Sequence, residues 1–265
     1  MKNILNFYSW ISENEGRNDF YKDELNTSFW QKINSDIPDD SGAEYYSFDE
    51  KLRNKLLEIA KDFYKDLKFE APIEDIQLTG SLANYNWTDK SDLDVHVLID
   101  FSLIDENKDL VKKAVDGLRF IWNIRHKLKI RGYDVELYLQ DVNEQHTASG
   151  LFSLLNNKWV RIPKYNPPEI DYKDVDEKFH GLTSDILEME NLVNSSNFIN
   201  ATEVEIYNHS VSLKNKIMNM RREGLAREGE FSVENLVFKK LRNEGYIEKV
   251  IELISKAYSN IYNEE

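Results

Sequence analysis

The sequence predicts an α/β fold: an α+β core built on a small mixed sheet, followed by a C-terminal helical bundle. Three observations predict this class. Residues 92–99 and 132–140 alternate between polar and apolar side chains, which is the period of a half-buried strand. Residues 106–129 place apolar side chains at helical spacing between these two strands. After a proline-rich segment at 163–168, the chain has helical periodicity to its end.

The proline-rich segment is also the predicted domain boundary. We divide the chain into an N-terminal arm at 1–46, a core at 47–165 and a helical domain at 166–265. Apolar residues at 4–11 and at 29–33 indicate two short amphipathic helices in the arm, packed on the core. The arm carries no recognisable chemistry.

Local signals predict the other elements. A capping box at Ser47–Glu50 predicts the start of a helix that ends near 68–72. A strand, a Gly-Ser turn with a short helix, and a later edge strand are expected at 74–79, 81–86 and 159–163. The helical domain is expected to hold four helices, the third capped by Ser232, at 174–193, 200–223, 232–244 and 246–262.

Composition excludes several classes of protein. The chain has 265 residues, of which 31% are charged and 41% hydrophobic, as is usual for globular proteins. It has no cysteine, which excludes disulfides, thiolate catalysis and cysteine zinc sites. No apolar run is long enough to span a bilayer and residues 1–10 lack a signal-peptide core, so we expect a cytoplasmic protein without a membrane partner. The net charge of −14 argues against a long nucleic acid as partner.

Two basic stretches stand out in this acidic chain. Residues 108–131 carry eight basic and two acidic side chains, a balance of +6. Residues 214–242 carry eight basic and four acidic side chains, a balance of +4. Both stretches are candidates for contacts with phosphate groups, and the alternative for each is a solvated helix face.

Chemistry is expected where Gly80-Ser81 is followed by Asp92 and Asp94. Side chains two apart on a strand point to the same face, about 7 Å apart at the backbone. Neighbouring carboxylates repel each other unless a cation lies between them, and their oxygens suit Mg²⁺ or Mn²⁺. Gly80 has no side chain to keep a phosphate from its backbone, and Ser81 offers an amide and a hydroxyl at a helix start. These residues predict a site for a metal-bound nucleoside triphosphate (NTP).

Other uses of Asp-x-Asp have to be weighed against this one. A calcium loop of the EF-hand type needs a further ligand and a glycine soon after the pair, whereas residues 95–98 belong to an apolar strand. Metal-dependent glycosyltransferases also contain Asp-x-Asp, but they need no Gly-Ser turn at this distance upstream. Trp87 precedes the aspartates, and its ring either stacks on a base or packs in the core.

A third acidic ligand is expected on the later strand, where Asp134 and Glu136 share one face. We prefer Glu136 because it lies deeper in the strand, between Val135 and Leu137, with Asp134 as the alternative. His146 and Ser149 follow the strand and are secondary candidates for substrate contacts, with a structural hydrogen bond as the alternative for His146.

The spacing of Gly80-Ser81 and Asp92-Leu93-Asp94 resembles the signature of the polymerase β-like nucleotidyltransferase superfamily, over residues of about 48–140. The chain is also loosely similar to uncharacterised nucleotidyltransferase-like proteins of tailed phages, which would place it in a host cytoplasm. The resemblance implies an enzyme that moves an NMP from an NTP to a hydroxyl acceptor and releases pyrophosphate. In this reading Asp92 and Asp94 hold Mg²⁺ on the triphosphate, and Glu136 completes a second metal site.

The acceptor is left open by the resemblance: it could be a small molecule, a protein or an RNA end. ATP is the first candidate for the NTP. Two alternatives are kept: a catalytically inactive nucleotide-binding or structural protein with the same fold, and a glycosyltransferase that uses Asp92 and Asp94.

Overall fold

The computed structural model describes residues 20–34, 42–145, 148–166, 169–194 and 202–262. The chain forms two compact units, residues 1–167 and 168–265, each with its own core. The predicted arm helix at 4–11 lies outside the described residues. The first unit is a mixed α/β structure and the second is helical, which confirms the predicted mixed sheet and helical C-terminal region.

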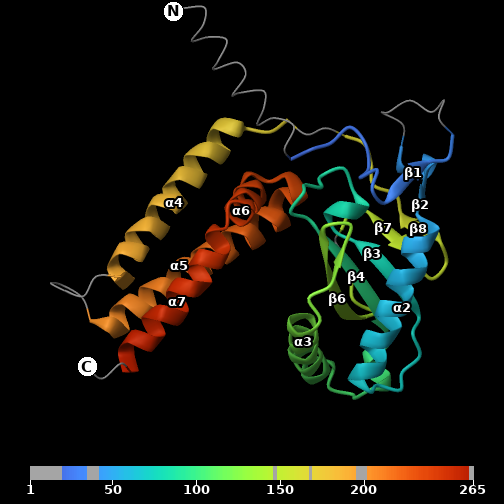
Figure 1. The fold of residues 1–265 in the computed structure, drawn as a ribbon, viewed down its shortest axis with the longest axis horizontal. Coiled ribbons are helices and arrows are strands. Elements are labelled where there is room, and N and C mark those ends of the chain that lie inside the picture. The colour runs from blue at the N-terminus through green and yellow to red at the C-terminus, as the bar shows by residue number, and fades with distance from the viewer. Residues whose placement is uncertain (1–19, 35–41, 146–147, 167–168, 195–201, 263–265) are drawn as a thin grey trace, which may run out of the picture. The chain divides into compact units, whose positions relative to one another are not determined.

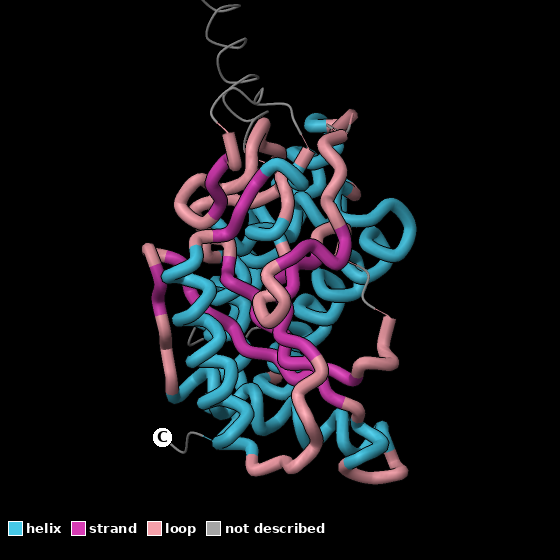
Figure 2. The backbone as a smooth tube through the Cα atoms, turned by 90° about the vertical axis from the view of Figure 1, so that its right-hand side faces the viewer, coloured by secondary structure: helices cyan, strands magenta, loops and turns pink. Residues whose placement is uncertain are grey.

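The first unit contains a six-stranded mixed sheet in the order β5-β6-β4-β3-β7-β8. Figure 1 labels its longer strands, and Figure 2 draws strands in magenta. Only β4 and β6 among these neighbours run parallel, joined by a crossover through α3. Its strands are β3 (Asp75–Thr79), β4 (Asp92–Ile99), β5 (Lys129–Ile130), β6 (Tyr133–Asp141), β7 (Leu151–Ser153) and β8 (Lys158–Arg161). Strand β8 ends the sheet, as expected for the segment near 159–163.

Two helices, α2 (Glu50–Leu67) and α3 (Lys108–Arg125), pack on this sheet (Figure 1). The predicted capping box at Ser47 is wrong, because Ser47 belongs to strand β2 (Tyr46–Phe48). Asp49 is the N-cap of α2 instead and accepts a hydrogen bond from the Leu52 amide, which satisfies an unpaired donor of the first turn. Leu56 and Phe63 of helix α2 are fully buried in the core of the first unit.

The prediction of a helix at 29–33 is also wrong. Residues Trp30–Lys32 form strand β1, which pairs antiparallel with β2. The ring of Trp30 stacks on that of Trp159 at 4.6 Å, and its indole N–H donates to the Leu82 carbonyl at 2.8 Å. Aromatic packing and one satisfied N–H therefore fix this segment to the core, and helical spacing of its apolar residues is incidental.

Helix α3 lies along the outer edge of β6, beyond the two residues of β5. The Asn123 side chain donates to the Leu137 carbonyl at 3.0 Å and accepts from the Leu137 amide at 3.1 Å. The amide group thus pairs with β6 as a neighbouring strand would. This contact brings the preceding turn of α3, with Arg119, to the rim of the sheet.

The second unit consists of helices α4 (Tyr172–Asn194), α5 (Glu203–Glu228), α6 (Val233–Asn243) and α7 (Tyr246–Tyr262). Ser232 caps α6 as predicted, and its hydroxyl accepts from the Asn235 amide. A Cβ on Gly224 of α5 would lie 2.7 Å from both the Ser232 hydroxyl and the Glu234 Cβ. Glycine at this position therefore permits α5 to approach the start of α6 closely.

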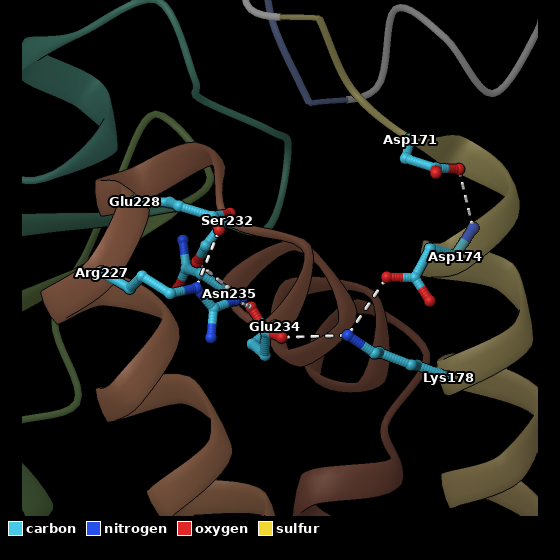
Figure 3. Close-up of polar contacts among 8 residues, drawn as sticks. All are labelled: Asp171, Asp174, Lys178, Arg227, Glu228, Ser232, Glu234 and Asn235. Carbon is cyan, nitrogen blue, oxygen red and sulfur yellow. Dashed lines mark hydrogen bonds and ion pairs between the residues drawn. The ribbon is translucent and has the colours of Figure 1, made fainter.

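A buried carboxylate joins three of these helices (Figure 3). Glu234 of α6 accepts from the Lys178 ammonium of α4 and from the Arg227 guanidinium of α5, both at 2.9 Å. Burial alone would raise the pKa of the Glu234 carboxyl, but hydrogen bonds from Lys178, a backbone amide and Arg227 outweigh it and hold the pKa below its usual value. All these charges are paired, so we assign the cluster to stability.

Replacing Glu234 by glutamine is expected to lower the free energy of unfolding at pH 7 by about 2 kcal/mol, between the values for exposed and fully buried pairs. A depressed folded-state pKa stabilises the fold above the unfolded pKa, and this contribution is lost as the pH falls through the folded pKa. The difference in unfolding free energy between wild type and Glu234→Gln, measured by urea unfolding, should therefore become smaller as the pH is lowered. The control is Glu177→Gln, which removes an exposed ion pair with Lys173 and should leave stability unchanged.

Candidate functional site

The register of the central strands brings the predicted acidic residues together. Asp92 and Asp94 of β4 lie opposite Asp134 and Glu136 of β6, respectively, and Thr79 of β3 lies on the other side of Asp94. The four acids share the partly exposed face of β4 and β6, whereas Leu93, Val95 and Val97 are fully buried on the other face. Neighbouring strands lie about 4.8 Å apart, so Asp94 and Glu136 are side by side.

The Gly80 turn approaches the same acids from the end of β3. Gly80 has a φ of +74°, which L side chains rarely adopt, and an added Cβ would lie 2.1 Å from Asp94 Oδ2. The turn backbone therefore lies directly against the Asp94 carboxylate. The Ser81 hydroxyl donates to Ser91 Oγ at 2.7 Å, so the hydroxyl that was predicted to contact phosphate is engaged with the segment before β4.

The two candidates for the third acid have different surroundings. Asp134 is exposed and forms an ion pair with Lys129 at 3.0 Å. Glu136 is half-buried, lies beside Asp94, and its Oε2 accepts a 2.5 Å hydrogen bond from the Tyr138 hydroxyl. Each candidate lies opposite one aspartate of β4, so Glu136 stays our prediction for the third ligand and Asp134 the alternative.

Three residues near the acids, Tyr138, His96 and Arg119, were not singled out from the sequence as site residues. The Tyr138 ring stacks on His96 with centroids 4.6 Å apart, and the Arg119 guanidinium lies 4.4 Å from its centroid. Burial, followed by the nearby Asp94 and Glu136 carboxylates, raises the pKa of the Tyr138 hydroxyl far above its usual value. Tyr138 therefore stays a neutral hydrogen-bond donor. The shared face of Tyr138 and Glu136 was visible in the alternation, but the approach of Arg119 depends on the tertiary fold.

The remaining candidates take structural contacts or are not described. His146 lies outside the described residues. The Ser149 hydroxyl accepts from the Asn84 side-chain amide at 2.6 Å, which places Ser149 beside the segment after the Gly80 turn. The Trp87 indole N–H donates to the Glu24 carbonyl at 3.0 Å, as the packing interpretation of this ring predicts.

Several cations of the first basic stretch already have acidic partners. Lys108 pairs with Asp141, Lys112 with Glu144, and Arg131 with Asp49. These pairs agree with the interpretation of the stretch as a solvated, ion-paired surface. Arg119 also has an acidic partner, Asp116 at 3.7 Å, and in addition its guanidinium lies over the Tyr138 ring next to the acidic residues.

The carboxylates of Asp92, Asp94 and Glu136 occupy adjoining positions in the sheet, and the Gly80 turn lies against Asp94. Carboxylate oxygens are ligands that fit a hard divalent cation. Within the part of the chain that the structure describes, no group of three His, Cys, Asp or Glu side chains is arranged closely enough to hold a metal. A cation at this place would therefore take one or two carboxylates and complete its ligand set from the nucleotide and water.

No protein-family model, curated protein or solved structure matches the chain. In the described ranges, no helix has the length and apolar character needed to cross a membrane.

Proposed function

We propose that the protein is a metal-dependent nucleotidyltransferase that moves an NMP from an NTP, with ATP as the first candidate, to a hydroxyl acceptor. The observation that carries this proposal is the row formed by Thr79, Asp94 and Glu136 in register, with Gly80 against Asp94. It supports the proposal because phosphoryl chemistry depends on positioning and on charge neutralisation more than on a reactive side chain.

Asp92 and Asp94 would hold the cation that accompanies the triphosphate, and Glu136 would hold a second cation near the acceptor. Such cations neutralise charge on the phosphates and lower the pKa of the attacking hydroxyl. The chain's own contribution is to fix the carboxylates on a rigid sheet and to leave Gly80 without a side chain, so that its backbone lies against the Asp94 carboxylate, near which the phosphates would lie. The acceptor would be a small molecule, a protein or an RNA end.

The test is incubation of the protein with each α-labelled NTP, Mg²⁺ and cell extract. The proposal predicts pyrophosphate release and transfer of the label to an acceptor. Absence of both with every NTP, in Mg²⁺ and in Mn²⁺, would contradict it. A parallel incubation with labelled sugar nucleotides tests the glycosyltransferase alternative, which predicts transfer of the sugar.

A second candidate is a nucleotide-binding or structural protein without catalysis. One observation favours it: the acids are not gathered into a metal cluster among the described residues. This candidate predicts that an NTP raises the melting temperature while no pyrophosphate is released.

The third acid can be identified by conservative substitution. Glu136→Gln is expected to reduce turnover by at least about a hundredfold, because it removes a charge beside Asp94 that would hold the second cation. Nucleotide binding should change less, since Asp92, Asp94 and the Gly80 turn remain. Asp134→Asn serves as the comparison: it is exposed and paired with Lys129, so its effect should be small. The opposite ranking would make Asp134 the ligand.

A further inference from the structure

We infer that Tyr138 is a positioning residue for Glu136 in the proposed site: its hydroxyl fixes the orientation in which Glu136 meets the cation. The effect of Tyr138 on cation binding rests on the proposed function, whereas the contact between Tyr138 and Glu136 is observed in the structure. Tyr138 lies two residues beyond Glu136 on the same face of β6, and its hydroxyl donates to Glu136 Oε2 at 2.5 Å. A charge-assisted hydrogen bond of this kind is stronger than one between neutral groups.

The Tyr138 ring is itself held from both sides of β6. On the β4 side, His96 lies opposite Tyr138 in register, and the two rings are nearly parallel with an interplanar angle of 16°. On the outer edge, Arg119 reaches the ring from α3, one turn before the Asn123 side chain that pairs with β6. Stacking and a cation–π contact therefore restrict the ring, and its hydroxyl has little freedom to leave Glu136.

Orientation matters because a glutamate side chain has three rotatable bonds and would otherwise sample many positions beside Asp94. With Oε2 held by Tyr138, the carboxylate presents a restricted set of directions to a cation. A ligand held in place by its neighbour binds a metal more tightly than the same ligand left mobile. Tyr138 thus acts through Glu136 and does not need to touch the nucleotide.

The experiment compares Mn²⁺ binding by the full-length protein, followed by electron paramagnetic resonance with a non-hydrolysable ATP analogue present. Tyr138→Phe keeps the ring, the stacking on His96 and the contact with Arg119, and removes only the hydroxyl. We expect the Mn²⁺ dissociation constant to rise about tenfold, the size typical for losing a ligand-supporting partner. Unchanged or tighter Mn²⁺ binding would overturn the inference.

A matched control separates this role from general stability. The Tyr64 hydroxyl also donates a 2.5 Å hydrogen bond, to the Ala71 carbonyl, at the end of α2. Tyr64→Phe should lower the melting temperature and leave Mn²⁺ binding unchanged. Equal loss of Mn²⁺ binding in both variants would mean that the effect of Tyr138→Phe is structural.

A double-mutant cycle tests whether Tyr138 acts through Glu136. In the double variant Tyr138→Phe/Glu136→Gln, Mn²⁺ binding should be no weaker than in Glu136→Gln alone, because the residue that Tyr138 orients is already lost. Additive losses would overturn the positioning role. If the wild-type protein binds no Mn²⁺ with the analogue, the proposed function fails as well; if it binds and only the Tyr138 results are negative, the proposed function stands without this inference.

Discussion

Asp94→Asn is expected to reduce Mg²⁺-dependent transfer by about a thousandfold, or about 4 kcal/mol of transition-state stabilisation. Asp94 is central because it lies between Thr79 and Glu136 in the sheet and directly under the Gly80 turn. Asparagine keeps the shape of the side chain and removes its charge, so packing should change little. The measurement is pyrophosphate release at saturating NTP.

The control for Asp94 is Asp109→Asn, which removes an exposed acid in the first turn of α3, away from the candidate site. It should retain wild-type activity. Full activity in Asp94→Asn would show that this carboxylate holds no essential cation.

Gly80→Ala is expected to abolish NTP binding and to lower stability. Two effects contribute: a φ of +74° strains any L residue by about 1–3 kcal/mol, and the new Cβ would have to displace an Asp94 oxygen 2.1 Å away. The sequence predicts that the turn leaves space for a phosphate. In the structure the turn backbone lies against the Asp94 carboxylate, so binding and stability should fall together.

Gly132→Ala separates the effect of backbone strain from the effect of displacing Asp94. Gly132 also has a positive φ, of +91°, but nothing lies within 4 Å of its added Cβ. The melting temperature should fall in both variants because of backbone strain. Calorimetric NTP titration should show a loss of binding in Gly80→Ala and none in Gly132→Ala. Equal NTP affinity in the two variants would argue that the Gly80 turn is purely structural.

Local periodicity predicted the strand that carries the acids, because one face of β4 is fully buried and the other is half-exposed. The observed bounds of β4, Asp92–Ile99, equal those of the alternating segment. Strand β7 was missed for the opposite reason: its three residues, Leu151–Ser153, are all buried and leave no alternation to read. The segment at 29–33 was misread because three residues are too few to distinguish a helical from a strand period.

The environment of the site depends on contacts between residues far apart in the sequence. The same-face position of Asp92 and Asp94 follows from strand geometry alone. The pairing of Asp94 with Glu136 depends on the parallel register of β4 and β6, which no local signal specifies. Arg119 reaches Tyr138 only because Asn123 fixes α3 to the edge of β6.

The most direct test of the central claim is calorimetric titration of the protein with α,β-methylene-ATP, in the presence and absence of Mg²⁺. If Asp92 and Asp94 hold the cation on the triphosphate, binding by the wild-type protein will require Mg²⁺, and Asp94→Asn will bind at least about tenfold more weakly. Binding that is equally tight without Mg²⁺, or in Asp94→Asn, would contradict the assignment of these acids as the metal site.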